Sequence, residues 1–210
     1  MELLLAWNAN LNLTAITDEE EFIKKHYVDS VAICAFPQIK EAQTVIDVGT
    51  GAGFPGIPLA ILYPDKKFLL MDSLNKRIKI IDGIAREIGL PNVAFRHGRA
   101  EELAQSKEYR EQFDLCVSRA VANLAVLSEY CLPFVRVGGW FAPYKTGSID
   151  EELKESRRAI SILGGSLEEN RPLHIKGYDL DHRILFIKKV AKTLAKYPRK
   201  AGTPAKEPLK

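Results

Sequence analysis

A glycine-rich loop after an apolar run is the strongest chemical signal in the sequence. The run Val45–Val48 contains one acid, Asp47, and glycine then recurs at alternate positions, at Gly49, Gly51 and Gly53. Glycine has no Cβ, so the backbone can turn tightly there and approach a ligand closely. A strand, such a loop and then a helix form the nucleotide-binding corner of an open α/β sheet.

Two cofactor motifs overlap in this loop. Gly51, Gly53 and Gly56 have the Gly-x-Gly-x-x-Gly spacing of dinucleotide-binding enzymes. Gly49, Gly51 and Gly53, with Asp47 two residues ahead, have the Gly-x-Gly-x-Gly spacing of S-adenosylmethionine (SAM) methyltransferases. The loop alone leaves both cofactors open.

Polar residues follow the next two predicted strands. Asp72 ends the second strand, where a carboxylate can accept hydrogen bonds from both ribose hydroxyls of NAD or of SAM. Ser73 beside it belongs to the same predicted cofactor site and is expected to cap the next helix. After the third strand, the backbone N–H of Ala100 and the carboxylate of Glu101 suit an adenine ring and its exocyclic amine.

The loop after the fourth strand is where a methyltransferase would face its acceptor. It reads Ser118-Arg119-Ala120-Val121, without the Asn or Asp with two prolines used for exocyclic amines and without a cysteine nucleophile. Cys116 lies inside the predicted strand and is expected to pack there. The acceptor should therefore carry a free lone pair, as guanine N7 does. Arg119 is the predicted catalytic residue, able to hold the guanine O6 edge, a phosphate or the cofactor carboxylate.

The elements that position these residues alternate between strands and helices. Such alternation predicts a mostly parallel sheet with helices on both faces. Five strand–helix units are followed by two strands with no long helix between them, which predicts seven strands with the last antiparallel. That final hairpin favours a class I SAM-dependent methyltransferase fold, which is Rossmann-like, over a plain dinucleotide fold. Strands are expected at 44–48, 67–71, 93–96, 113–117, 140–144, 167–175 and 184–190, and helices at 18–35, 55–62, between Ser73 and Gly89, and at 99–104, 120–131 and 151–163.

Composition sets the class of protein. The chain has 210 residues, a net charge of +3 and 46% hydrophobic residues, as expected for one globular domain of ordinary size. The three cysteines fit buried thiols in a reducing cytoplasm, and no metal site or membrane span is expected. We expect an N-terminal helical cap over 1–40, a cofactor-binding domain over 41–190 and a basic, Pro- and Gly-rich tail over 191–210.

Basic residues are unevenly spread and concentrate near the C-terminus. A basic tail is either a solvated end or an RNA-binding arm, because lysines near phosphates release counterions. As an arm, its removal after Val190 should weaken RNA binding without changing SAM binding. The predicted RNA contacts are Lys76, Arg77, Lys145, Arg199 and Lys200.

These motifs together resemble one family over nearly the whole chain, the bacterial 16S ribosomal RNA guanine-N7 methyltransferases, also called glucose-inhibited division protein B. The matching residues are Asn12–Ile16, His26 with Asp29 and Ser30, Asp47–Pro58, Asp72 and Ser73 with Lys76 and Arg77, Gly98–Glu101, Ser118–Ala122, and Tyr197–Pro204.

The resemblance implies methyl transfer from SAM to N7 of a guanine near the ribosomal decoding site. It implies cofactor contacts at Gly49, Phe54, Ala100, Glu101 and Arg119, and a partner that is 16S rRNA, the small ribosomal subunit or its assembly intermediate. Family members begin earlier, so we expect the N-terminal helical piece to be incomplete. Two rival functions remain open from the residues, an NAD-dependent oxidoreductase and a non-catalytic RNA-binding protein.

Overall fold

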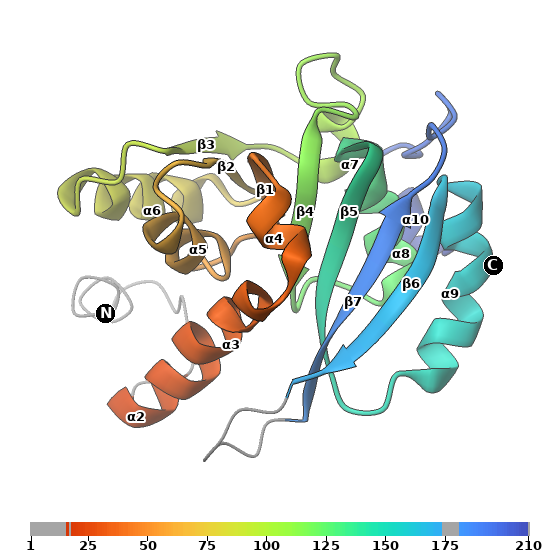
Figure 1. Cartoon of the computed structure of the whole chain (residues 1–210). Coiled ribbons are helices and arrows are strands. Elements are labelled where there is room, and N and C mark those ends of the chain that lie inside the picture. Colours follow the sequence, from red (N-terminus) through yellow and green to blue (C-terminus); the bar gives the residue numbers. More distant parts are fainter. Residues whose placement is uncertain (1–15, 17, 174–180, 210) are drawn as a thin grey trace.

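A single seven-stranded sheet forms the centre of the molecule (Figure 1). The computed structural model describes residues 16, 18–173 and 181–209, so most of the matched segment Asn12–Ile16 and the predicted strand end at 174–175 lie outside the described residues. The strands, in the spatial order β3-β2-β1-β4-β5-β7-β6, are β3 (Val93–His97), β2 (Lys67–Asp72), β1 (Thr44–Val48), β4 (Phe113–Arg119), β5 (Val135–Thr146), β7 (His182–Lys189) and β6 (Gly165–Pro172).

The strand directions confirm the predicted class I methyltransferase topology. The pairs β1–β2, β2–β3, β1–β4 and β4–β5 are parallel, whereas β7 is antiparallel to both β5 and β6. The strand order reverses between β1 and β4, and open α/β sheets bind ligands at that switch point. The loops that follow β1, β2, β3 and β4 are therefore the place to look for a site.

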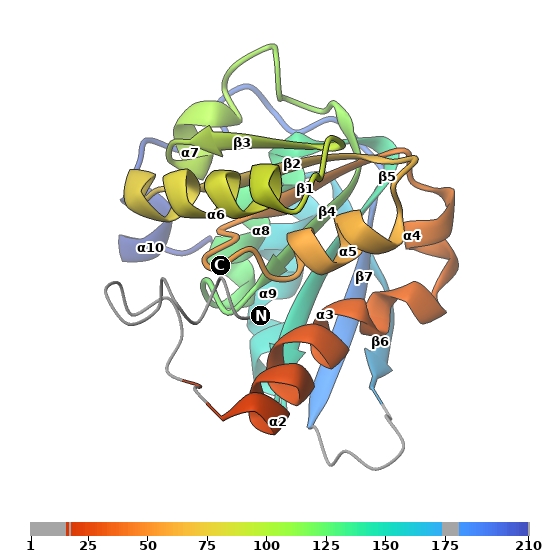
Figure 2. The ribbon, with the colours of Figure 1, turned by 90° about the vertical axis from the view of Figure 1, so that its left-hand side faces the viewer.

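Helices cover both faces of the sheet (Figures 1 and 2). One face carries α7 (Ala100–Leu103), α8 (Leu124–Cys131) and α9 (Asp150–Ile162), and the other carries α4 (Pro37–Glu41), α5 (Gly56–Leu62) and α6 (Asn75–Glu87). Alternate β1 residues serve the two layers, because Ile46 and Val48 pack with α8 while Val45 packs with α5. A 3-10 segment η3 (Leu132–Phe134) leads into β5, and α10 (Thr203–Lys206) lies near the C-terminus.

One irregular helical segment precedes the sheet. It consists of α2 (Glu19–Phe22), a π-helix η1 (Ile23–Val28), α3 (Asp29–Val31) and a 3-10 helix η2 (Ala32–Ala35), which together fill the predicted helix 18–35. Asp18 caps it by accepting a hydrogen bond from Glu21 N at 2.9 Å. The π-helix changes the backbone hydrogen-bond pattern in the turn that contains His26, and such turns are frequent at functional sites.

Several predicted boundaries are wrong for local reasons. Gly138 and Gly139 lie within β5 and do not form the turn before it. Helix α8 begins at Leu124, four residues after the predicted start, because the Asn123 side chain accepts from Ala125 N and Val126 N and caps the helix there. Before that cap, Ala120 has a φ of +56°, which a helix cannot contain.

In the described part of the chain, none of the helices has the length and apolar character that crossing a membrane requires. Those same residues contain no group of three or more His, Cys, Asp or Glu arranged to hold a metal ion.

Candidate functional site

Asp47 organises the glycine loop from beneath. Its side chain is fully buried, and Oδ2 accepts hydrogen bonds from Thr50 Oγ1 at 2.7 Å and from Gly56 N at 2.9 Å. Among the described residues no group donates to Oδ1. Asp47 was predicted as a cofactor contact, but the structure places it under the loop, where it fixes the loop to the start of α5.

The glycines of the loop have different requirements. Gly49 has a φ of +74°, and a Cβ there would lie 2.5 Å from Val121 Cγ2. Gly51 has a φ of +60° and no heavy atom within 4 Å of its Cβ position, so only its backbone conformation calls for glycine. A Cβ on Gly56 would lie 2.7 Å from Leu70 Cγ, which makes Gly56 a helix-packing glycine.

Asp72 connects two of the loops. Its Oδ2 accepts from Gly51 N at 3.0 Å and its Oδ1 from Leu74 N at 2.8 Å, and its side chain is 5% exposed. The prediction that Ser73 caps α6 is wrong, because the helix has Leu74 at its N-cap and no side-chain cap. Asp72 instead satisfies the backbone of that turn, and each carboxylate oxygen keeps a second lone pair.

A small cavity at the ends of β1, β2 and β3 is lined by five of the ten predicted cofactor residues. Its volume is about 130 Å³, and it is lined by Gly49, Asp72, Ser73, Ala100 and Glu101, with Val121 at its other side. A carboxylate at the second strand and an open glycine loop at the first fit the ribose of SAM. Gly53 and Phe54 do not line this cavity.

Arg119 links the sheet to the N-terminal helical segment. Its Nη1 donates to Asp29 Oδ2 at 2.8 Å and to Lys25 O at 2.9 Å, and its Nη2 lies 3.1 Å from His26 Nδ1. Asp29 is almost completely buried, and its Oδ1 lies 2.7 Å from His182 Nδ1. The buried Asp29 carboxylate thus orients the Arg119 guanidinium at the end of β4 and also contacts His182 at the start of β7.

Phe54 lies in an aromatic cluster and not at a free ligand surface. Its side chain is buried, its ring stacks on His26 with centroids 4.9 Å apart, and Phe22 and Tyr27 contact its edges. The Arg119 guanidinium lies 5.5 Å from its centroid. The predicted contact between Phe54 and the cofactor stays a prediction, and in this structure Phe54 supports His26 and Arg119.

A larger cavity of about 440 Å³ opens beside Arg119. This volume lies within the range of small-molecule sites. Lys145 at its edge forms an ion pair with Glu152 at 2.7 Å and donates to Ala122 O at 3.0 Å. Its polar lining residues are Lys25, His26, Asp29, Arg119, Tyr144, Lys145, Thr146, Glu152 and His182.

His26 and Asp29 contact Arg119 and line the larger cavity, although neither was among the predicted site residues, and their spacing was the available signal. Residues three apart on a helix lie on one face, and both fall in the predicted helix 18–35. Glu152 and His182 have no comparable signal, since they reach the site from α9 and β7 only after the chain has folded.

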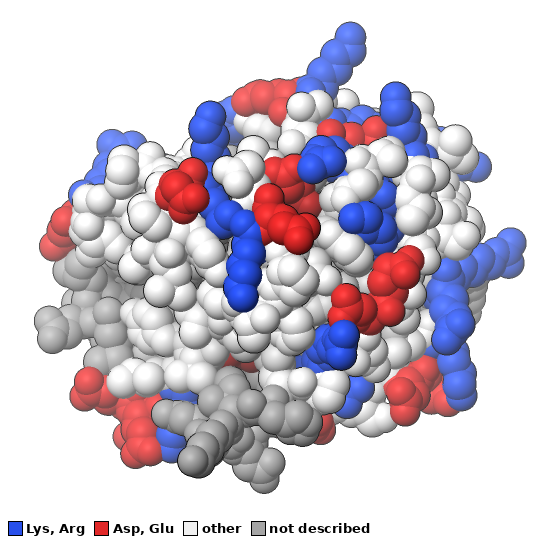
Figure 3. All heavy atoms as spheres, viewed as in Figure 1, with Lys and Arg blue, Asp and Glu red and all other residues white. Residues whose placement is uncertain are grey.

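The predicted RNA-binding residues divide into two groups. Lys76 and Lys200 are exposed, whereas Arg77, Lys145 and Arg199 lie in ion pairs with Asp72, Glu152 and Glu129. On the face drawn in Figure 3, Lys and Arg alternate with Asp and Glu. Exposure therefore favours Lys76 and Lys200 for contact with phosphates, and the RNA-binding role of all five residues stays a prediction.

Two titrating groups at the site, half-buried His26 and fully buried Asp47, have opposite effects on the pH dependence of stability. Burial, with Arg119 acting in the same direction, lowers the pKa of His26 from 6.5 to about 4. Burial raises the pKa of Asp47 from 3.8 to about 6, against the hydrogen bonds from Thr50 and Gly56. Between pH 4 and 6 the unfolded chain carries an extra proton at His26 and the folded chain carries one at Asp47, so the two contributions to the pH dependence oppose each other.

We expect single variants to separate these contributions. Between pH 4 and 6, His26→Gln should make the slope of the unfolding free energy against pH more negative than in the wild type. Asp47→Asn should make that slope more positive. Each difference slope should approach about 1.4 kcal/mol per pH unit. Urea unfolding at half-unit steps of pH measures it, and difference slopes of the same sign for both variants would contradict the assignment.

The comparisons with known proteins agree with this geometry. The family model described as rRNA small subunit methyltransferase G matches residues 1–180. The chain belongs to that family. It is 54% identical to the protein named ribosomal RNA small subunit methyltransferase G of Clostridium novyi, over 99% of this chain and 86% of the relative, and 52% identical to that of Clostridium tetani, over 97% and 85%.

Solved structures show the same fold at low sequence identity. A putative O-methyltransferase from Klebsiella pneumoniae has a TM-score of 0.59 at 16% identity, covering 90% of this chain and 89% of that one. A SAM-dependent O-methyltransferase from Thermotoga maritima has a TM-score of 0.58 at 17% identity, covering 91% and 72%. Family membership and fold identify this family member as a methyltransferase with SAM as its methyl donor, and the alternative of an NAD-dependent oxidoreductase is wrong.

Proposed function

We propose that this family member transfers the methyl group of SAM to N7 of a guanine in the decoding-site loop of 16S rRNA. The observation that carries the proposal is one loop between two cavities. Val121 lines the small cavity with Asp72 and Glu101, while Ala120 and Ala122 line the larger cavity with Arg119. A donor in the first cavity and a base in the second would meet across this loop.

The residues of the chain would act mainly by binding and orientation. When bound, SAM supplies an electrophilic methyl group on its sulfonium. Asp72 would hold the ribose, and Ala100 and Glu101 the adenine. Guanine N7 has a free lone pair and loses no proton on methylation, so no general base is required. Alignment of two reactants can lower the activation barrier by about 7–11 kcal/mol when the reacting groups are well oriented.

The charge of the larger cavity suits this acceptor. The Arg119 cation is paired with Asp29 and the Lys145 cation with Glu152. Methylation at N7 leaves the base positively charged, and paired cations repel that charge less than free ones would. Arg119 retains donor capacity for the guanine O6 edge, since its five N–H groups exceed the three polar contacts that it makes with the described residues.

The proposal extends to the surroundings of the reaction. We propose a small ribosomal subunit or an assembly intermediate as the partner, in the cytoplasm, with residues 1–40 as a helical cap over a catalytic domain of 41–190. The aromatic contacts of Phe54 with Phe22, His26 and Tyr27 support the cap.

The test is methylation of unmethylated 16S rRNA with radiolabelled SAM, followed by mapping of the modified base. Free RNA and isolated small subunits serve as two separate substrates. We expect label at N7 of one guanine of the decoding-site loop in at least one of them. RNA binding without label in either substrate would favour the non-catalytic alternative, and label on another base or atom would overturn the acceptor assignment.

A further inference from the structure

The C-terminal segment 191–209 is anchored to the domain, although its composition is that of a solvated tail. Tyr197 and Pro204 are buried, and Tyr197 belongs to the apolar core beneath α8. Lys189, just before this segment, is fully buried and donates to Leu132 O at 2.7 Å. The segment lies beyond residues 1–180, the part that the family model matches.

One buried ion pair anchors the middle of the segment. The guanidinium of Arg199 donates from Nε to Glu129 Oε1 at 2.9 Å and from Nη2 to Oε2 at 2.7 Å, and the Arg199 backbone N donates to Oε1 at 2.8 Å. The Glu129 side chain on α8 has no exposed surface. Two parallel hydrogen bonds from an arginine fork fix both distance and orientation. Arg199 therefore acts here as an anchor, and its guanidinium is engaged with protein.

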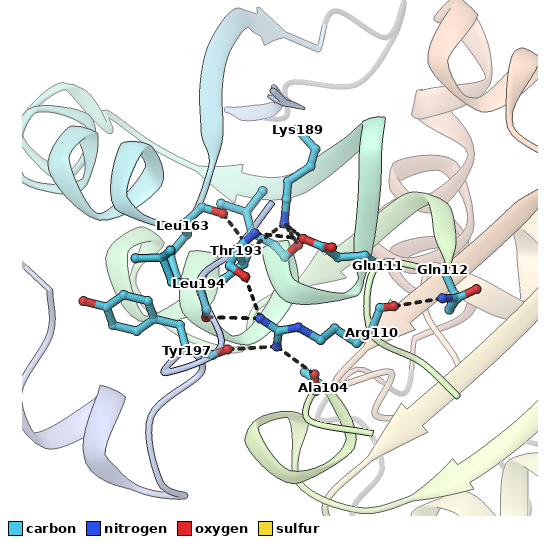
Figure 4. A network of polar contacts seen from close by, with 10 residues as sticks. Ala104, Arg110, Glu111, Gln112, Leu163, Lys189, Thr193, Leu194 and Tyr197 are labelled. Atoms are coloured by element: carbon cyan, nitrogen blue, oxygen red, sulfur yellow. Dashed lines mark hydrogen bonds and ion pairs between the residues drawn. The ribbon is translucent and has the colours of Figure 1, made fainter. Parts of the chain in front are cut away.

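A second anchor ties the segment to the end of α7 (Figure 4). Arg110 donates to Ala104 O at 3.1 Å, where α7 ends, and to Tyr197 O at 2.9 Å and Thr193 O at 2.8 Å in the segment. Beside it, Glu111 Oε1 accepts from Thr193 N at 2.8 Å.

The start of α7 carries the contact that matters for the cofactor. Gly202 N donates to Glu101 Oε1 at 2.9 Å. Glu101 is buried and lines the small cavity with Gly49 and Asp72. Within the described residues no hydrogen bond reaches its Oε2. The segment thus holds one carboxylate oxygen and leaves the other for a ligand.

An isolated α7 could not hold Glu101 by itself. The helix has four residues, Ala100–Leu103, and helices that short are not stable in water without tertiary contacts. Both ends of α7 are tied to the C-terminal segment. At its end, Ala104 O accepts from Arg110, which also binds the segment, and at its start, Glu101 accepts from Gly202 of the segment. We propose that segment 191–209 completes the cofactor site, with Arg199 and Gly202 as positioning residues that set the Glu101 carboxylate for the exocyclic amine of adenine.

This inference rests on the proposed adenine contact of Glu101 and is independent of the RNA substrate. It also opposes the expectation that removal of the tail leaves SAM binding unchanged. Removal after Val190 would take Tyr197 out of the core, so a milder change is needed to test the inference. Truncation after Pro198 keeps Tyr197 and the Arg110 contacts, and Glu129→Gln in the same variant avoids leaving a buried carboxylate without its partner. Gly202→Pro is the second variant. Proline removes the N–H donor to Glu101 and also cannot adopt the φ of +84° that Gly202 has, so it displaces the backbone at this contact.

The measurement is equilibrium binding by calorimetry of two ligands, S-adenosylhomocysteine and S-inosylhomocysteine, which has a keto group in place of the adenine amine. We expect the wild type to prefer the adenosyl ligand by at least about 10-fold, as one hydrogen bond to a charged group would give. Both variants should lose most of that preference, chiefly through weaker binding of the adenosyl ligand. Lys206→Ala, an exposed change in the same segment, should keep it.

Each other outcome overturns the inference. If the wild type binds both ligands equally, Glu101 does not contact the adenine amine. If the variants keep the wild-type preference, the segment does not position Glu101. An equal loss for both ligands would indicate general destabilisation and not positioning. Failure of the proposed RNA substrate would leave all these measurements unaffected, so the two failures are distinguishable.

Discussion

Replacing Arg119 by alanine is expected to lower kcat/KM for RNA methylation by on the order of 10²- to 10³-fold, the loss seen when one oriented donor is removed from an active site. Arg119 lines the larger cavity and is oriented by Asp29 and His26. Alanine removes both the proposed donor to the base and the link to the N-terminal helical segment. Initial rates with labelled SAM at varied RNA concentrations measure the effect.

Two companions make that result specific. Arg136→Ala removes the same residue type at the opposite end of the strands, near the start of β5. Arg136 is half exposed there and pairs with Asp114, so the change should leave the rates unchanged. Arg119→Lys keeps the charge but loses the planar fork, so it should restore little activity. Wild-type turnover by Arg119→Ala would remove this residue from the mechanism.

Asp72→Ala is expected to weaken the binding of S-adenosylhomocysteine by roughly 10- to 100-fold, since hydrogen bonds to a charged group contribute about 1.5–3 kcal/mol. The change removes the predicted ribose acceptor and also the acceptor for Gly51 N and Leu74 N, so the glycine loop loses its partner. Calorimetry on the purified variant gives the affinity without any RNA.

The matched control is Asp82→Ala. Asp82 is a carboxylate on α6 that pairs with Arg86 at 2.9 Å and does not line the small cavity. It should bind the ligand as the wild type does. Equal weakening in the two variants would point to altered folding of α6, and no weakening in Asp72→Ala would exclude the ribose contact.

The order of elements was predictable because each strand and helix is specified locally. β1 begins and ends at the predicted residues, Thr44 and Val48, and the final hairpin gives the predicted antiparallel strand. In a parallel sheet the ends of successive strands share one edge, so Asp72, Ala100 and Glu101 had to lie near the glycine loop, and they line one cavity. The errors at Ser73 and at the start of α8 concern caps, where single hydrogen bonds decide the boundary.

The sequence by itself determined the fold class, the family and the group of residues that line the small cavity, since periodicity and motif spacing are local properties. The tertiary structure decided the partners of charged and aromatic residues. It paired Arg119 with Asp29, stacked Phe54 on His26, and paired Arg199 with buried Glu129. These pairs join residues from separate elements. A buried charge is unfavourable without a partner, and no local sequence pattern specifies which residue of another element will be that partner.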